Sequence, residues 1–145
     1  MPADTFTESE PMAVYVVDAH AAIELARQGY SASGERELFA PTLLRSQVLA
    51  MVHAELVARR GDPGKALDLA ERACRLPRRL LGDAVLRQTA WAIATEQGWP
   101  ETYDAEYIAL TQLHGVALVT GSEILREKAA VFVRTEPVDL LLDGT

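Results

Sequence analysis

Two short runs of apolar, β-branched residues predict buried strands. The first, AVYVVD, covers residues 13–18 and ends at Asp18; the second, VALVT, covers residues 116–120. Unbroken apolar runs of this length are typical of strands that a parallel sheet buries on both faces. Residues 37–40 and 131–135 give weaker signals of the same kind. Together these patterns predict a sheet of up to four strands.

Elsewhere apolar residues recur every three or four positions, which predicts helices. The residues expected at the helix starts are Asp18, Thr42, Asp62, Asp83, Thr102 and Ser122. Their side chains are of the kinds that cap helix N-termini. The helix after Asp83 is expected to point these residues inward: Val85, Leu86, Ala90, Ile93 and Ala94.

Alternation of strands and helices implies an α/β fold, in which a central parallel sheet carries helices on both faces. Residues 13–145 suit one such domain, and the polar residues 1–12 are expected to form a flexible tail. In sheets of this kind ligands bind at the carboxyl ends of the strands. Asp18 and Ser122 each follow a predicted strand, so the site is expected at that edge.

The chain has 145 residues and a formal net charge of −7. A strongly acidic protein does not attract nucleic acid through its overall field, so RNA binding would need a local basic patch. Seven basic residues lie close together in the sequence: Arg59, Arg60, Lys65, Arg72, Arg75, Arg78 and Arg79. They could steer RNA, but the charge pattern alone favours a solvated surface on two helices.

The cellular compartment is indicated only indirectly. Cys74 is the only cysteine, so an intrachain disulfide is impossible, which fits a reducing cytoplasm. No apolar run approaches the roughly 20 residues of a membrane span. The polar N-terminus lacks the basic and apolar regions of a secretory signal. We therefore expect a cytoplasmic protein without a membrane segment.

Three stretches resemble motifs of the PIN-domain family. VVDAHAAIEL resembles its opening strand, which ends in a metal-binding Asp, and APTLLRSQVLAMVH resembles its Pro-led second motif. TYDAEYIALTQLHGVALVTGSEIL is very similar to the third and fourth motifs run together. The match keeps the family's order and spacing over nearly the whole chain after residue 12. Within the family it looks most like the VapC-like toxins, small bacterial endoribonucleases that are paired with antitoxins.

The resemblance implies a three-layer α/β/α sandwich and metal-dependent hydrolysis of RNA, with Mg²⁺ or Mn²⁺ as cofactor. The four acidic positions of the family fall on Asp18, Gln47, Asp104 and Ser122, so only two are carboxylates here. Asp18 and Asp104 are the expected catalytic residues and metal ligands. Gln47, Ser122 and the nearby Thr120 are expected to hold a metal-bound water or contact the substrate. A homodimer and a VapB-like antitoxin partner are also implied.

The same residues have ordinary structural explanations. Asp18 and Ser122 are good helix N-caps. Asp104 lies in the first turn of a predicted helix, where the helix dipole favours negative charge. Gln47 lies near the edge of an apolar stripe, where its amide could reach solvent or a polar partner. These explanations do not exclude a role in a metal site.

Two functions therefore stay open. The first is a VapC-like ribonuclease whose activity is reduced, because two fewer carboxylates weaken the attraction for a divalent metal. The alternative is a catalytically inactive PIN-like protein that binds RNA or a protein partner.

Overall fold

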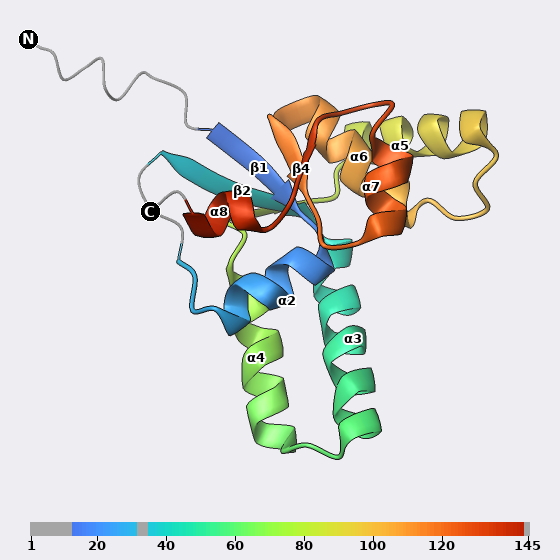
Figure 1. Ribbon diagram of the computed structural model, residues 1–145. Helices are drawn as coiled ribbons and strands as arrows, with labels where there is room; N and C mark the ends of the chain where they lie inside the picture. Colours follow the sequence, from blue (N-terminus) through green and yellow to red (C-terminus); the bar gives the residue numbers. More distant parts are fainter. Residues whose placement is uncertain (1–12, 32–34, 144–145) are drawn as a thin grey trace, which may run out of the picture.

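Five parallel strands form the central sheet in the computed structural model, which describes residues 13–31 and 35–143 (Figure 1). The strands are β1 (Ala13–Val17), β2 (Arg36–Pro41), β3 (Arg79–Leu81), β4 (Ala117–Val119) and β5 (Thr135–Glu136). Their order across the sheet is β3-β2-β1-β4-β5. The flexible tail expected for residues 1–12 lies outside the described residues.

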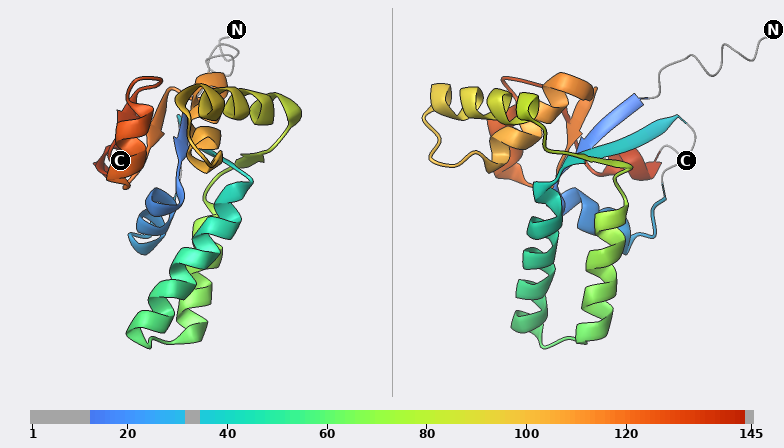
Figure 2. Two further views of the ribbon diagram at one scale, coloured as in Figure 1. Left: turned by 90° about the vertical axis from the view of Figure 1, so that its right-hand side faces the viewer. Right: turned by 180° about the vertical axis from the view of Figure 1, so that it is seen from behind.

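Seven helices accompany the strands in the described part of the chain. They are α2 (Ala19–Arg27), α3 (Leu43–Arg59), α4 (Pro63–Arg75), α5 (Ala84–Gln97), α6 (Tyr103–His114), α7 (Glu123–Ala129) and α8 (Asp139–Asp143). Helix α6 packs on β1, β2 and β4 and carries α5 on its outer side. Helix α2 covers the opposite face, so the sheet lies between two helical layers (Figure 2). The expected three-layer α/β/α sandwich is therefore confirmed.

The two faces differ in how far their helices reach. Helices α3 and α4 form an antiparallel pair that extends well beyond the end of the sheet (Figures 1 and 2). On the other face α6 is buried on most sides, and Ala105, Ile108 and Ala109 are fully shielded from solvent. Among the described helices, none combines the length and the apolar character needed to cross a membrane.

Local sequence signals explain most of the helix boundaries. The Asp62 and Asp83 carboxylates accept hydrogen bonds from the backbone N–H groups of Lys65 and Leu86, at 3.0 Å in both cases. Both caps were predicted. Thr42 and Thr102 also occupy N-cap positions, but their side chains make no capping hydrogen bond.

Three details of the prediction were wrong. Strand β3 was missed, because a three-residue edge strand is defined by its pairing with β2 and has too few residues to show a pattern. The last strand was expected at 131–135, whereas β5 is limited to Thr135–Glu136. Val85 was expected to point inward but is 56% exposed, because α5 packs only its other side against α6.

The chain reverses its winding direction at the middle of the sheet. From β1 it runs outward through β2 to β3, then returns through α5 and α6 to β4 on the other side of β1. Helices that follow β1 and β4 therefore leave in opposite directions, which opens a crevice at the carboxyl ends of these two strands. Asp18 directly follows β1, and Thr120 directly follows β4.

Candidate functional site

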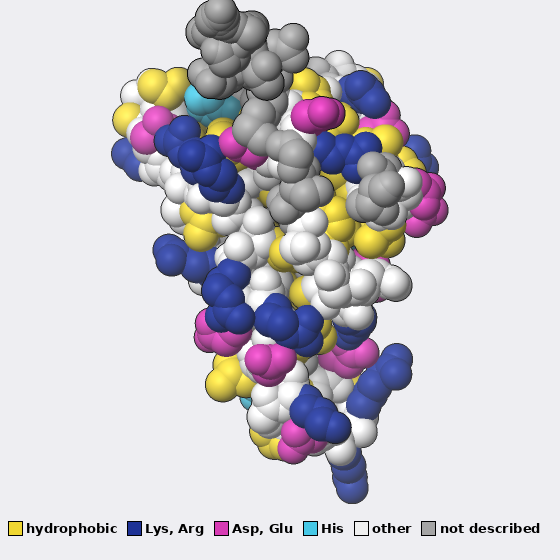
Figure 3. Space-filling view, turned by 90° about the vertical axis from the view of Figure 1, so that its left-hand side faces the viewer, with side chains coloured by type: hydrophobic (Ala, Val, Ile, Leu, Met, Phe, Trp, Pro, Cys, Tyr) yellow, Lys and Arg dark blue, Asp and Glu magenta, His cyan; other side chains and the backbone are white. Residues whose placement is uncertain are grey.

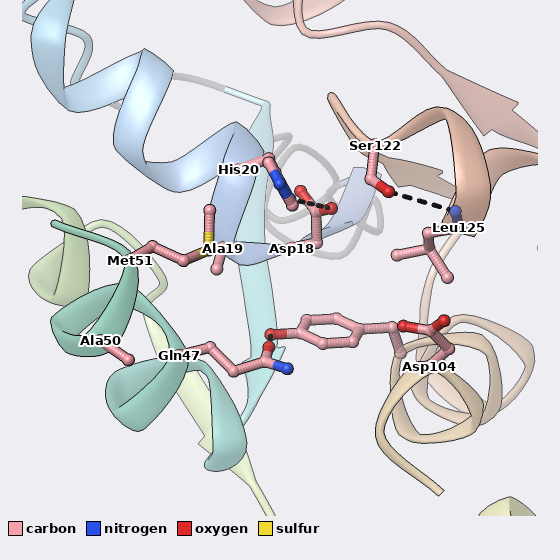
Figure 4. A pocket seen from close by; sticks show the side chains of 10 residues that line it. Asp18, Ala19, His20, Gln47, Ala50, Met51, Asp104, Ser122 and Leu125 are labelled. Atoms are coloured by element: carbon pink, nitrogen blue, oxygen red, sulfur yellow. Dashed lines mark hydrogen bonds and ion pairs between the residues drawn. The ribbon is translucent and has the colours of Figure 1, made fainter. Parts of the chain in front are cut away.

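A cavity of about 210 Å³ lies at this crevice. Its walls include all four positions that the PIN resemblance marks, namely Asp18, Gln47, Asp104 and Ser122. Figure 4 shows these side chains arriving from four separate elements: the end of β1, α3, α6 and the start of α7. The structure thus brings together residues that are more than 100 positions apart in the sequence.

Asp18 is held by the surrounding backbone and side chains. It is 3% exposed, and its Oδ1 accepts a 2.8 Å hydrogen bond from the N–H of Ala21, so it caps α2. Its Oδ2 accepts a hydrogen bond from the hydroxyl of Thr120. Both carboxylate oxygens are thus fixed by hydrogen bonds from the chain itself.

Thr120 is buried beside Asp18 and connects it to Ser122. Its hydroxyl donates to Asp18 and accepts a 2.8 Å hydrogen bond from the backbone N–H of Ser122. Thr120 is not among the residues that line the cavity around Asp18; it lines a neighbouring pocket with Glu136. Thr120 therefore acts on the site through Asp18, whose carboxylate it helps to orient.

Ser122 is the N-cap of α7, as its ordinary structural explanation predicted. Its Oγ accepts a 3.2 Å hydrogen bond from the N–H of Leu125 (Figure 4). Serine oxygen carries no formal charge at neutral pH, so this position adds a polar group to the cavity without adding a carboxylate.

Gln47 finds its polar partner on α6. The Tyr107 hydroxyl donates a 2.6 Å hydrogen bond to the Gln47 Oε1. Burial of Tyr107, which is 2% exposed, raises the pKa of its phenol far above the usual range, and the nearby Asp18 charge acts in the same direction. The phenol therefore stays protonated and keeps donating to Gln47. The sequence indicated that Gln47 needs a partner, but not that Tyr107 supplies it.

Asp104 lies in the first turn of α6 and forms an ion pair across to α7. The Lys128 Nζ is 2.9 Å from the Asp104 Oδ2, and both side chains are about one third exposed. The same ammonium lies 4.9 Å from the centre of the Trp99 ring. Sequence analysis missed Lys128, because its helix is short and nothing in the spacing links it to a residue 24 positions earlier.

His20 is the other titratable group near Asp18. Its Nδ1 lies 3.6 Å from the Asp18 Oδ2, and half of its side chain is exposed (Figure 4). The contact with the Asp18 carboxylate raises the pKa of His20 above its usual range, although partial burial acts against this. The charges of Asp18 and Asp104 add to the increase. A protonated His20 would lower the net negative charge of the cavity.

The donor set can be compared with what a divalent metal requires. In the described part of the chain no three His, Cys, Asp or Glu side chains are grouped closely enough to hold a metal ion. This excludes from the described residues a closed protein cage such as a structural zinc site. Mg²⁺ keeps several waters and needs only one or two carboxylates, so Asp18 and Asp104 fit Mg²⁺ or Mn²⁺ in kind and number.

The basic residues that could have formed an RNA patch are largely paired with acidic neighbours. The ion pairs are Arg59–Glu55, Arg72–Asp68, Arg75–Glu71 and Arg78–Glu37. Figure 3 shows a face of the molecule on which basic and acidic side chains are interspersed. Pairing favours the solvated-surface interpretation over a concentrated RNA-binding patch.

Similarity to known proteins is found in the fold. Neither a protein-family model nor a curated protein sequence matches the chain. The structure is similar to that of PAE2754 from Pyrobaculum aerophilum, with a TM-score of 0.69 and 23% sequence identity, over 91% of this chain and 96% of that one. It is also similar to VapBC-1 from nontypeable Haemophilus influenzae, with a TM-score of 0.58 and 12% identity, over 87% of this chain and 98% of that one. The fold is PIN-like.

Proposed function

We propose that the protein is a VapC-like PIN-domain ribonuclease, the toxin of a cytoplasmic toxin–antitoxin pair, with reduced activity. The observation that carries this proposal is the shared cavity of Asp18 and Asp104 at the carboxyl ends of β1 and β4. Two carboxylates around one cavity repel each other unless a cation lies between them, so this arrangement favours a ligand of positive charge.

The chain's own residues have separable roles in this proposal. Asp18 and Asp104 would hold Mg²⁺ or Mn²⁺, which when bound supplies activation of water and neutralisation of the phosphate charge. Thr120 orients Asp18 through its hydroxyl. Gln47 and Ser122 provide neutral polar oxygens at the cavity wall, where a water or an RNA oxygen could be placed.

Reduced activity follows from the charge of the site. The resemblance implies carboxylates at the two positions where this chain has Gln47 and Ser122, and the remaining Asp104 is paired with Lys128. Because metal affinity depends on ligand charge, the metal should bind more weakly than at a site with four carboxylates.

Three contacts favour the alternative of an inactive binding module. The Gln47 oxygen is occupied by Tyr107, Ser122 caps α7, and Asp104 has a counter-ion within the chain. A site whose polar groups are satisfied internally has less need of a metal. Such a protein would keep the fold and bind RNA or a protein without turnover.

The proposed partners are RNA, a VapB-like antitoxin and a second copy of the chain. VapBC-1, which has a similar fold, gives the antitoxin proposal its support. Homodimer formation is supported by large apolar side chains that solvent reaches on two helices: Leu49 and Val57 on α3, and Val85 and Trp91 on α5. Exposed apolar side chains mark a protein interface where they form a contiguous patch, whereas single scattered ones are normal.

The test is cleavage of a random-sequence single-stranded RNA pool with added Mn²⁺. Three proteins are compared: wild type, Asp104→Asn, and the double variant Gln47→Glu with Ser122→Asp. Cleavage by wild type that is lost in Asp104→Asn and in EDTA would support the ribonuclease. Cleavage by the double variant alone would show that the natural chain is inactive, and would support the binding module.

A further inference from the structure

The Asp104–Lys128 ion pair changes the charge that the cavity presents. Among the described residues, Asp18 has no Lys or Arg partner; the only cationic group recorded beside it is His20. Asp104, by contrast, is neutralised by the Lys128 ammonium at 2.9 Å. The two carboxylates therefore differ: Asp18 accepts hydrogen bonds from the neutral groups of Ala21 and Thr120, whereas Asp104 is paired with a full positive charge of the same chain.

Lys128 and a divalent metal cannot share Asp104 without strong repulsion. An ion bound to Asp104 would carry two positive charges within a few ångströms of the ammonium. Like charges at such separations interact strongly in a partly buried site, where solvent screening is weaker than in bulk water. The ammonium therefore weakens metal binding at Asp104 for as long as it stays on the carboxylate.

Trp99 gives the ammonium a second partner beside Asp104. Lys128 Nζ already lies 4.9 Å from the centre of the Trp99 ring, within the range of a cation–π contact. Trp99 packs edge-on against Phe132, with ring centres 6.3 Å apart, so its ring is held in place. Trp99, Asp104 and Lys128 also line one pocket of about 250 Å³, which gives the lysine side chain room to shift.

We infer that Lys128 is a built-in competitor of the divalent metal at Asp104, and that Trp99 retains its ammonium when the metal displaces it. This inference rests on the proposed function, since the divalent metal is part of that proposal. Lys128 acts here as a positioning residue, because it controls whether Asp104 is free and touches neither metal nor RNA.

A purely structural role for the pair would have other consequences. If Lys128 only tied α7 to α6, its removal would lower stability and leave metal affinity unchanged. Ion pairs that are one third exposed contribute little to folding, so variants at Lys128 are expected to fold. Metal affinity therefore separates the two roles more sharply than thermal stability does.

The experiment measures Mn²⁺ binding directly, from the loss of the free-ion electron paramagnetic resonance signal. Lys128→Met removes the charge and keeps a long apolar side chain, Lys128→Gln is a second neutral variant, and Lys128→Arg is the charge-retaining control. We expect both neutral variants to bind Mn²⁺ about tenfold more tightly than wild type or more, a change of about 1.4 kcal/mol. The control should remain close to wild type, and adding Asp104→Asn to Lys128→Met should abolish the gain.

Equal Mn²⁺ affinity in wild type and both neutral variants, or no binding by any of them, would overturn the inference. RNA cleavage is assayed separately, so the two failures can be told apart. If the neutral variants bind Mn²⁺ more tightly than wild type but no protein cleaves RNA, the proposed ribonuclease activity is wrong and the role of Lys128 stands. If wild type cleaves RNA and the variants bind Mn²⁺ no more tightly than wild type, the role of Lys128 is wrong and the proposed function stands.

Discussion

Thr120 donates its hydroxyl hydrogen to Asp18 across the carboxyl ends of the adjacent strands β4 and β1. Both side chains are at least 95% buried, so solvent competes little for this hydrogen bond. Thr120→Val keeps the shape and removes this donor, and it also leaves the Ser122 N–H without its acceptor. We expect it to lower the free energy of unfolding by about 1–3 kcal/mol, measured by urea denaturation.

Thr120→Ser is the matched control, because it keeps the hydroxyl and loses only a methyl group. It should retain most of the stability that Thr120→Val loses. Equal destabilisation by both variants would mean that packing of the methyl group, rather than the hydrogen bond to Asp18, is what stabilises this position.

Asp18 itself should tolerate one neutral substitution and not another. Asn is as good an N-cap as Asp, so Asp18→Asn should keep the cap on α2 while removing the charge. Asp18→Ala should lose the cap as well, with an additional cost of about 1 kcal/mol. Thermal unfolding separates the two variants, and Mn²⁺ binding should be lost in both. Retention of Mn²⁺ affinity in Asp18→Asn would contradict Asp18 as a metal ligand.

Gln47 and Tyr107 should be energetically coupled. Tyr107→Phe removes the donor to Gln47 Oε1 and is expected to cost about 1 kcal/mol of unfolding free energy. A double-mutant cycle with Gln47→Leu measures the pair alone, and we expect a coupling of at least about 0.5 kcal/mol. Additive effects would show that the hydrogen bond adds nothing to stability.

The reactivity of Cys74 should show a pH dependence that reports on folding. Partial burial, followed by the charge of Glu71, raises the pKa of the Cys74 thiol in the folded chain. Folding thus favours the protonated thiol. The stability that this adds to the folded chain is present below the pKa of the unfolded chain and is lost as the pH rises through the folded pKa. The alkylation rate, which follows the thiolate, should therefore have its midpoint at a higher pH than that of an ordinary exposed cysteine.

The denatured chain in guanidinium chloride is the control for this measurement. Because Cys74 is the only cysteine, the alkylation signal has a single source. Its midpoint should fall to the ordinary range on denaturation. A folded midpoint at or below the denatured one would contradict the effect of burial.

The sequence was most informative where a feature is local. The apolar run that ends at Asp18 and the aspartates at 62 and 83 mark a strand end and two helix starts through short-range chemistry alone. The order of these elements was enough to predict a parallel sheet with helices on both faces. The position of the site followed, because the carboxyl ends of parallel strands lie at one edge.

The partners within the site could not be predicted in the same way. Lys128 reaches Asp104, and Tyr107 reaches Gln47, only because α6 lies between α3 and α7 around the cavity. Such contacts depend on packing angles and side-chain rotamers, which the periodicity of apolar residues along the sequence does not reveal. Strand β3 was missed for a similar reason, since its identity comes from pairing with β2 rather than from its own residues.

The two carboxylates stand on the parts of the chain that should open last. Asp18 follows the central strand β1, and Asp104 starts the deeply buried helix α6, whereas Gln47 belongs to α3, which extends beyond the sheet with exposed Leu49 and Val57. Amide hydrogens of β1 and α6 should exchange near the rate of global unfolding, and those in the outer turns of α3 much faster. The half of the cavity that carries the two carboxylates is thus rigid, whereas the helix that carries Gln47 is anchored in the core by Leu44 and Val48 and opens first at its far end.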